Sequence, residues 1–352
     1  MIEIDGSLYS GSGTIIRDAV SLASLVSQRI HVINIRAKRK KPGLRHQHLK
    51  GILACNQICQ GELEGASLSS KEITFRPGRE IKGGKFRWDI GTAGSTTMLA
   101  SMILPLALFA QKSSIHEIIG GIFQDFAPSV FHLKNVLFPI LRRMGLDINI
   151  EIIQPGYVPK GNGIIKLMVN PQSEKLKTIS LLKKGKLKEI KGIALSSLLE
   201  ERKVSKRMAE KCYEELQGYY SEIEIAYDSK NSSFYKKVSI QPGASLAIWA
   251  KTDTGCLIGS DMAGKLGRSA EFIGKQVARN LIENLQTNAT VDRYLADQLV
   301  PFCALADGTS EYLIPKITEH IKTRLWLVEK ILGAKTSIKD NKVRIEGIGF
   351  FV

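Results

Sequence analysis

A histidine near the C-terminus and a polar segment upstream of it carry the groups that nucleotidyl transfer requires. His320 follows Thr318, a residue type that caps helices, so its imidazole is expected at a helix start. Tyr294, Asp297 and Gln298 offer an aromatic face, a carboxylate and an amide within two helical turns. An enzyme that attaches a nucleotide to itself needs a nitrogen to attack phosphorus, a ring to stack on the base and polar groups for the nucleotide. An isolated histidine is more often structural, and only the presence of Tyr294, Asp297 and Gln298 favours His320 as a nucleophile.

Two turns near the N-terminus offer groups that could hold phosphate. Gly11-Ser12-Gly13 precedes a predicted helix, and glycine there leaves backbone amides facing outward. The turn lacks the lysine and serine that end a P-loop, and Arg17, one helical turn later, could be an ordinary surface arginine. The basic segment 39–48 places Arg39 and Gln47 beside a predicted helix N-terminus. Such groups suit a terminal phosphate or a phosphate backbone, and a solvated basic loop is an equally good interpretation.

The net charge favours a polyanionic partner. The 352 residues include 50 Lys and Arg against 34 Asp and Glu, a formal charge of +16. Nucleic acid is the leading candidate for a chain with this excess, although a basic, solvated surface alone would also explain it. Five cysteines at scattered spacings complete no zinc site, and spacing alone identifies no metal ligands.

Hydropathy predicts a globular chain that makes no use of a membrane. Hydrophobic residues make up 43% of the chain and charged residues 24%, which is ordinary for a protein with a large core. The longest apolar stretch, Met98–Ala110, contains Ser101 and Pro105 and is shorter than the roughly 18 apolar residues of a membrane span, so it predicts a buried helix. The chain opens directly on a strand pattern at Ile2–Ile4, no signal peptide is visible, and a cytoplasmic location is expected.

The order of predicted elements repeats along the chain. Each repeat is expected to run strand, helix, strand, helix and then two strands, and a third, shorter copy begins directly with a helix. Helices crossing between strands predict an α+β fold in which each unit packs two helices on one face of a four-stranded sheet. The three repeats are assigned to residues 1–179 and 287–352. A small α+β domain at 180–286, entered through a Lys-rich stretch, is inserted between them.

Three element predictions depend on local pattern alone. A hairpin is expected from Gly65–Leu68 and Glu72–Arg76, where β-prone residues follow glycine. Val130–Met144 and Asp292–Ala306 are each predicted as one uninterrupted helix.

Taken together, these segments resemble the RNA 3′-terminal phosphate cyclases, most closely the archaeal branch, over nearly the whole chain. Several motifs of medium specificity in one order are far more specific than any one of them. In chain order the matching stretches are Ile4-Asp5-Gly6, the Gly-rich turn to Arg17, Lys41–Leu44 with Gln47–Leu49, Phe75–Gly78, Gly91–Ser95, Gly120-Gly121 with Ala127-Pro128, Tyr294–Gln298, and His320 with Thr323.

The resemblance implies both a fold and an activity. The fold would be three repeats like the C-terminal domain of a bacterial translation initiation factor, with a small inserted domain. The enzyme would use ATP and a divalent metal, Mg or Mn, to convert an RNA 3′-phosphate to a 2′,3′-cyclic phosphate. His320 would attack the α-phosphate of ATP, AMP would pass to the RNA phosphate, and the 2′-hydroxyl would then displace AMP. Neutral imidazole is nucleophilic near pH 7, which agrees with that chemistry.

The resemblance also implies roles for individual side chains. Tyr294 and Pro128 would sandwich the adenine, although a proline at such a place is more often a plain helix start. The implied ATP-binding residues are Tyr294, Leu295, Ala296, Asp297, Gln298, Pro128 and Ser101. The implied phosphate-binding or RNA-end-binding residues are Arg17, Arg39 and Gln47.

The chain departs from the family pattern at four positions around this site. Ser10 stands in the Gly-rich turn where a glutamate is usual, which leaves the metal contact unassigned. Ser101 replaces a glutamine that commonly contacts ATP, while Phe131 replaces an aspartate and Arg324 an asparagine. These changes are consistent with an altered substrate preference, a rearranged metal site or a weakened enzyme.

Two other functions agree with parts of the sequence. A non-catalytic RNA-binding relative, as in the ribosome-biogenesis branch of this superfamily, would explain Ser10 and Ser101. That branch lacks the nucleophilic histidine, whereas this chain retains His320 together with Tyr294 and Asp297. A small-molecule transferase on a related repeat fold, such as an enolpyruvyl transferase, is disfavoured by the charge of +16 and by the His320 segment.

Overall fold

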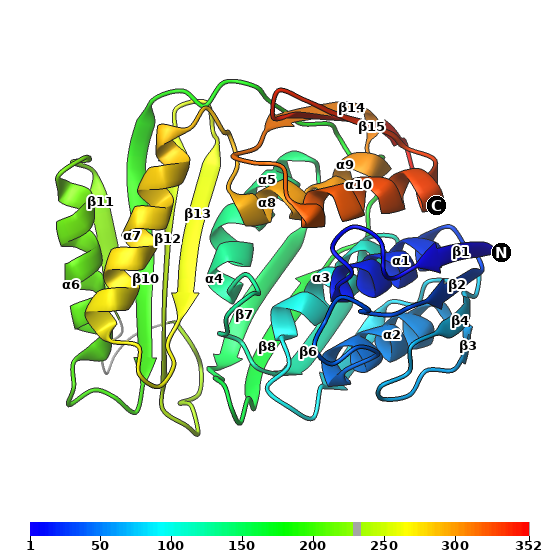
Figure 1. Ribbon diagram of the computed structural model, residues 1–352, viewed down its shortest axis with the longest axis horizontal. Coiled ribbons are helices and arrows are strands. Elements are labelled where there is room, and N and C mark those ends of the chain that lie inside the picture. Colours follow the sequence, from blue (N-terminus) through cyan, green and yellow to red (C-terminus); the bar gives the residue numbers. More distant parts are fainter. Residues whose placement is uncertain (228–233, 352) are drawn as a thin grey trace.

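Four small sheets, each lined by helices, build the protein (Figure 1). The structure is a computed structural model that describes residues 1–227 and 234–351. Within these residues every sheet has four strands, three sheets belong to the predicted repeats, and the fourth belongs to the inserted unit. The predicted α+β fold of repeated units is therefore confirmed. Val352, the end of the predicted core segment, lies outside the described residues.

The first repeat follows the predicted order of elements. It consists of β1 (Ile2–Asp5), α1 (Gly13–Leu25), β2 (Ile30–Ile33), α2 (His46–Cys59), β3 (Glu62–Glu64) and β4 (Ile73–Arg76). The strands lie in the order β1-β2-β4-β3, with β1 and β2 parallel. The predicted strand at Gly65–Leu68 is wrong, because Gly65 and Ser69 take left-handed φ angles of 73° and 66° that turn the chain. Glu62–Glu64 pairs with β4 instead.

The second repeat has the same sheet order, and its second helix contains a π-helical turn. It consists of β5 (Gly84–Asp89), α3 (Thr96–Leu108), β6 (Ser114–Gly120), α4 (Val130–His132), the π-helical turn η1 (Leu133–Leu137), α5 (Phe138–Arg143), β7 (Ile148–Gln154) and β8 (Gly163–Val169). The strand order is β5-β6-β8-β7. The apolar helix α3 is buried almost throughout. None of the helices in the described part of the chain combines the length and the apolar character needed to span a bilayer.

The third repeat is split by the inserted unit. Its first strand, β9 (Ser180–Leu181), pairs in parallel with β14 (Asp307–Leu313) across the whole length of the insertion. The remaining elements are α8 (Arg293–Gln298), α9 (Val300–Leu305), α10 (Glu319–Leu332), β15 (Lys335–Lys339) and β16 (Lys342–Ile348). The strand order β9-β14-β16-β15 matches the other repeats, so the third copy has the first strand that the sequence prediction left out. A two-residue strand is too short to give a periodic signal.

A proline breaks the long helix that was predicted at Asp292–Ala306. Pro301 has no backbone N–H to donate to the carbonyl of Asp297, four residues earlier. The helix is interrupted at Leu299, whose backbone stays right-handed helical (φ −73°, ψ −26°), and Arg324 Nη1 donates to the free carbonyl oxygen of Asp297 at 2.6 Å. The break between α8 and α9 therefore tethers the end of α8 to α10.

The inserted unit has its own core and lies at one end of the molecule, on the left in Figure 1. It consists of β10 (Leu187–Ser197), α6 (Val204–Gln217), β11 (Ile223–Tyr227), β12 (Gly243–Thr252), β13 (Leu257–Ala263) and α7 (Ala270–Gln286). The strand order is β11-β10-β12-β13, and β13 is the edge that faces the repeats. An isolated bridge between Leu257 and Val291 joins that edge to the entry into α8.

Helices of all three repeats meet in the middle of the molecule. In Figure 1, α1, α3 and α10 lie side by side, and α1 packs on both α3 and α10. Because the repeats share one topology, this packing brings the turns before their helices to one place. The Gly-rich turn before α1 and the start of α10, which carries His320, therefore become neighbours although they are far apart in the sequence.

Candidate active site

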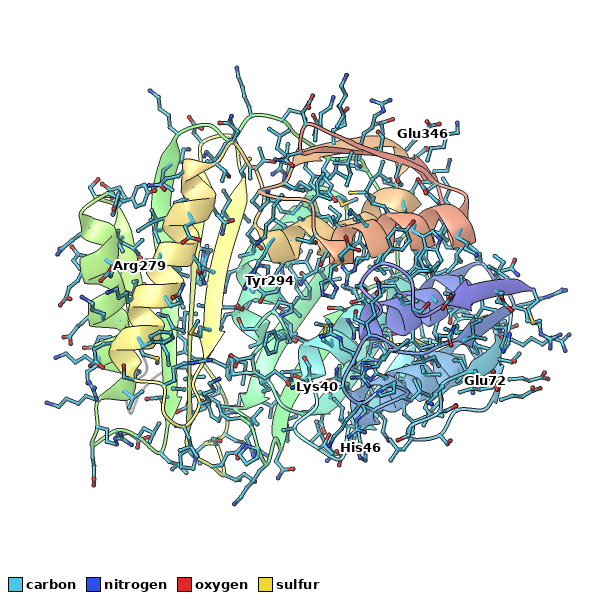
Figure 2. The ribbon with its side chains drawn as sticks, viewed as in Figure 1. Lys40, His46, Glu72, Arg279, Tyr294 and Glu346 are labelled. Atoms are coloured by element: carbon cyan, nitrogen blue, oxygen red, sulfur yellow. The ribbon has the colours of Figure 1, made fainter. Side chains whose placement is uncertain are left out.

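A cleft of about 370 Å³ opens where the N-terminal ends of α1, α2 and α10 meet. We call it the His320 cleft. Nine predicted site residues line it: Arg17, Arg39, Gln47, Ser101, Pro128, Tyr294, Asp297, Gln298 and His320. Figure 2 places Tyr294 near the middle of the molecule, between β13 and the repeats. Helix N-termini carry partial positive charge, so their convergence suits a phosphate group.

The charged side chains of the His320 cleft are mostly cationic. Arg17, Arg36, Arg39 and Arg324 line it, and Asp297 is the one carboxylate among the described residues of the lining. Burial lowers the pKa of Arg17 to about 10, which still leaves the guanidinium charged at neutral pH. This excess of fixed positive charge favours a polyanion such as a triphosphate.

Three other predicted residues lie outside the lining. Leu295 and Ala296 are buried in the core beneath α8, at 0% and 3% exposure, so their side chains do not face the cleft. Ser10 begins the Gly-rich turn and is bonded to α10: its backbone N–H donates to Thr323 Oγ1 at 3.2 Å, and its hydroxyl accepts from Thr323 Oγ1 at 2.9 Å. At the position where a glutamate is usual, the serine therefore ties the first repeat to α10.

His320 lies in the first turn of α10 and is held by one defined hydrogen bond. Thr318 caps this helix as predicted, accepting from Ile321 N at 3.2 Å. The Nδ1 atom of His320 lies 3.1 Å from Thr14 Oγ1. Burial, followed by Arg324 and Arg17, lowers the pKa of His320 to about 4. The imidazole is therefore neutral at pH 7 and keeps a lone pair.

A buried ion-pair network supports the floor beneath His320. Arg324 Nε lies 2.8 Å from Asp18 Oδ2, and Arg324 Nη1 lies 3.3 Å from Asp297 Oδ1. Burial would lower the pKa of Arg324, but the two carboxylates outweigh it and raise that pKa. Burial raises the pKa of Asp297 to about 6 despite the neighbouring Arg324. The network joins α1, α8 and α10, so one arginine fixes elements of two repeats.

A second histidine packs against the Gly-rich turn. His48, in the first turn of α2, is 4% exposed, and its Nδ1 accepts from the backbone N–H of Arg45 at 3.3 Å. Burial, followed by Arg17 and Arg36, holds the pKa of His48 well below its usual value. A Cβ atom at Gly13 would lie 2.1 Å from His48 Nε2. Gly13 is thus required for the close approach of α2 to α1.

Gln47 and Ser101 are partly engaged by the protein itself. Gln47 Oε1 accepts from Ser95 N at 2.9 Å, which links the start of α2 to the cap of α3. Ser101 Oγ donates to Thr97 O at 2.9 Å, and Thr97 Oγ1 donates to Pro128 O at 2.8 Å. These bonds fix the far wall of the cleft.

Tyr294 is positioned by a buried junction between the second repeat, the inserted unit and α8. Asp292, 1% exposed, caps α8 by accepting from Tyr294 N at 2.8 Å, and it also accepts from Gly259 N of β13 at 2.8 Å. His132 Nε2 lies 3.1 Å from Asp292 Oδ2. Burial would lower the pKa of His132, but Asp292 outweighs it and raises that pKa. We call Asp292, His132 and Gly259 the Asp292 junction.

A divalent cation finds no ready-made protein cage near the cleft. Among the described residues no group of three or more His, Cys, Asp or Glu side chains is placed to hold a metal. Ser10 supplies no carboxylate, and Asp297 is paired with Arg324. Phe131 is 4% exposed and packs on Phe123 at a ring distance of 5.5 Å, so the core occupies that position. These residues do not form a metal site by themselves.

Sequence reasoning missed several residues of the His320 cleft. Thr14 and Phe126 carried no signal, because neither residue type is diagnostic in a turn. Arg36 precedes the basic segment 39–48, and its charge alone indicates no role, yet its Nη1 donates to Lys41 O at 2.7 Å and to Gly43 O at 2.8 Å and thereby shapes the loop. Arg324 stood out only as a departure from the family pattern, and its two carboxylate partners lie on other elements.

Comparisons with known proteins point to one family. A family profile described as RNA 3′-terminal phosphate cyclase matches residues 8–338. A protein of that name from Methanopyrus kandleri is 36% identical over 345 residues, covering 97% of this chain and 96% of its own. The Pyrococcus furiosus protein of that name is 37% identical over 340 residues, covering 96% and 95%. The Thermococcus kodakarensis protein of that name is 38% identical over 334 residues, covering 94% and 93%.

Proposed function

We propose that this chain, which belongs to the RNA 3′-terminal phosphate cyclase family, converts an RNA 3′-phosphate to a 2′,3′-cyclic phosphate at the expense of ATP, with His320 as the site of adenylylation. One observation carries the assignment to His320. Its imidazole is neutral, is fixed through Nδ1 by Thr14, and lines a cleft that four arginines make positive. His48 also lines the cleft beside Arg17 and Arg36, but it is 4% exposed and its Nε2 packs against Gly13, whereas His320 is only partly buried.

In the first step, Nε2 of His320 attacks the α-phosphorus of ATP. A P–N bond forms, the bond from the α-phosphorus to the bridging oxygen breaks, and pyrophosphate leaves. In the tautomer with the proton on Nδ1, the 3.1 Å bond to Thr14 Oγ1 directs the lone pair to Nε2. No described group donates to Nε2, so this nitrogen is available for attack.

The remaining steps return His320 to its starting state. An oxygen of the RNA 3′-phosphate attacks the phosphorus of the bound AMP, and the electron pair of the P–N bond returns to Nε2. The product is an anhydride between the RNA phosphate and AMP. The neighbouring 2′-hydroxyl oxygen then attacks the RNA phosphorus, its proton passes to water, and AMP leaves. The ring closure needs no further energy, because the anhydride supplies a good leaving group.

The arginines of the cleft would stabilise the charge that these steps move. Phosphoryl and nucleotidyl transfer depend mainly on positioning and on electrostatic stabilisation of phosphate oxygens. Arg17 and Arg39 are the predicted phosphate ligands, and the N-termini of α1 and α10 point their backbone amides at the same space. Tyr294 and Pro128, which both line the cleft, would hold the adenine between them.

The family chemistry is expected to use a divalent metal, which would offset charge on the triphosphate. The described residues offer no set of three His, Cys, Asp or Glu ligands for such an ion. Mg²⁺ commonly takes most of its ligands from water and substrate phosphates, so such a metal would enter with ATP.

Incubation with ATP labelled at the α-phosphate tests the proposal. The wild-type protein, given Mg²⁺ or Mn²⁺ and then run on a denaturing gel, should retain label that is acid-labile. The His320→Ala variant should retain none. Absence of covalent label with either metal would overturn the proposed enzyme and favour a non-catalytic RNA-binding relative. Conversion of a 3′-phosphorylated oligonucleotide to a cyclic end then tests the later steps.

A further inference from the structure

A second cavity adjoins the His320 cleft and has no role in the chemistry above. Its volume is about 270 Å³, and it shares Phe126 and Tyr294 with the His320 cleft. One wall is the loop between β6 and α4, and the other is built by β13, the turn after it and α7. The inserted unit therefore forms half of a compartment that opens beside the nucleophile.

Phe126, at the boundary of the two cavities, has a conformation that burial does not explain. It is 92% exposed, whereas the nearby Phe123 and Phe131 are 1% and 4% exposed in the core. Its φ angle is 67°, in the left-handed region that a bulky side chain rarely adopts. Exposing a ring and straining its backbone both cost free energy, and such outliers concentrate where a ligand is bound.

The polar groups around this ring match a nucleotide. Arg293, Lys265 and Arg268 line the second cavity. Asp125 and Asp261 line it as well. Arg268 is committed to Asp125 through bonds of 2.9 Å and 3.1 Å, and Lys265 lies 3.8 Å from the same carboxylate. The exposed Arg293 contacts the face of Tyr294 at 4.7 Å and donates to its hydroxyl at 3.0 Å. An aromatic ring beside cations is the usual combination for single-stranded nucleic acid, in which bases stack and phosphates pair with arginine or lysine.

The reaction itself restricts what can occupy this space. The RNA 3′-phosphate must reach the AMP on His320, so the nucleotide that carries it must lie next to the cleft. The adenine of ATP is assigned to Tyr294 and Pro128 in the His320 cleft, which leaves the second cavity, with Phe126 at its boundary, for the substrate. This step rests on the proposed function.

We propose that Phe126 is the stacking platform for the 3′-terminal base of the RNA, in a subsite whose opposite wall is the inserted unit. Stacking on a ring accepts every base, so the subsite would bind RNA ends of any sequence. It would fix the terminal ribose and so present its 2′-hydroxyl and 3′-phosphate to the cleft.

A cycle of two changes tests the platform. One change is Phe126→Ala, and the other is an oligonucleotide whose 3′-terminal residue lacks its base but keeps the 2′-hydroxyl and the 3′-phosphate. Either change alone should raise the KM for RNA roughly 5- to 150-fold, the range for loss of one stacked base. Both together should raise it no further, because they remove the same contact. An oligonucleotide abasic at the fifth residue from the 3′ end serves as the substrate control.

Matched variants separate stacking from other effects. Phe126→Trp should restore the KM, whereas Phe126→Leu, which keeps an apolar side chain, should not. Tyr219→Ala removes another exposed aromatic, 63% exposed between α6 and β11, and should leave the KM unchanged. The proposal is overturned if the abasic terminus does not weaken the wild-type enzyme, or if the two changes multiply. Failure of the proposed function is distinct, because the wild type would then form no His320–AMP without RNA.

Discussion

His320, which is half-buried, and His132, which is buried, have opposite electrostatic surroundings. Around His320, Arg324, Arg17 and Arg39 add to burial, and its pKa falls to about 4. Around His132, Asp292 outweighs burial, and the pKa rises above the usual 6.5. Burial lowers the pKa of the imidazole at both sites, so the opposite charges of the neighbours account for the difference between the two pKa values.

The comparison separates a reactive site from a structural one. His320 combines a neutral ring, a single hydrogen bond and a place in an open cleft. His132 is 2% exposed, and its Nε2 contacts the carboxylate of Asp292. That carboxylate also accepts hydrogen bonds from the first backbone amides of α8 and from Gly259 N. Perturbed histidines concentrate at functional sites, but only the first could react with a substrate. The second fixes the tyrosine that is expected to stack on the adenine.

The largest expected effects come from replacing each histidine with alanine and measuring both AMP-adduct formation and the free energy of unfolding. His320→Ala should abolish formation of the AMP adduct while lowering the free energy of unfolding by less than about 1 kcal/mol, because one partly exposed hydrogen bond is lost. His132→Ala should retain adduct formation but lower the free energy of unfolding by about 3–5 kcal/mol, because it leaves the Asp292 carboxylate buried and unpaired. Gel labelling and urea unfolding measure the two properties. Equal loss of stability in both variants would contradict the distinction.

Asp292→Ala sharpens the structural half of the comparison. The variant removes the cap of α8 and the partner of His132, and we expect a loss of about 3–5 kcal/mol in unfolding free energy. The KM for ATP should rise as Tyr294 loses its position, with a smaller change in kcat. The matched control is Asp307→Ala, which breaks a surface pair to Lys175 at 3.2 Å and should cost about 1 kcal/mol or less. A KM for ATP that stays at the wild-type value would contradict the positioning role.

Local pattern was enough to predict most of the scaffold. Thr318 as a helix cap, the paired sheets and the inserted unit follow from capping residues, alternation and turn glycines. The nine predicted residues that line the His320 cleft come from all three repeats, and the family resemblance assigned them to one site from the sequence alone. Their individual roles remain predictions.

What the sequence could not supply is pairing across distance. The strand β9 is recognisable only through its partner β14, beyond the inserted unit. Arg324 differs from an ordinary helical arginine only through Asp18 and Asp297, which belong to other elements. The helix at Asp292–Ala306 was predicted without an interruption at Pro301, and the arginine that binds the freed carbonyl of Asp297 could not be inferred from the sequence either. Such contacts depend on the packed structure and not on local propensity.

The two histidines should also respond oppositely to pH. In the Asp297→Asn variant, which removes the carboxyl with a pKa of about 6, formation of the AMP adduct at saturating ATP should stay nearly level from about pH 8 to pH 5. It should fall by half near pH 4, where His320 gains a proton and loses its lone pair. The rate is measured by labelling with ATP and stopping each sample in alkali, because an acid quench would hydrolyse the AMP adduct. A midpoint near the ordinary 6.5 would mean that the arginines do not hold the imidazole neutral.

Stability provides the matching measurement. The unfolded chain protonates His320 near pH 6.5, so the lowered pKa contributes stability above that pH that is lost as the pH falls toward about 4. For His132 the raised pKa acts in the other direction. Its contribution is full below pH 6.5 and is lost as the pH rises through the folded-state pKa. Urea unfolding of the wild type and each alanine variant across this range separates the two trends.

The smallest expected effect concerns the hydrogen bond that orients the nucleophile. Thr14→Val keeps the shape of the side chain but removes the hydroxyl that lies 3.1 Å from His320 Nδ1. The rate of adduct formation should fall roughly 3- to 10-fold, the worth of one neutral hydrogen bond. Thr14→Ser keeps the hydroxyl and should stay within about twofold of the wild type. Because Arg17 Nη2 also donates to Thr14 Oγ1, at 3.3 Å, a larger loss in Thr14→Val with a raised KM for ATP would assign the hydroxyl to phosphate binding instead. An unchanged rate would mean that packing at the start of α10 alone orients His320.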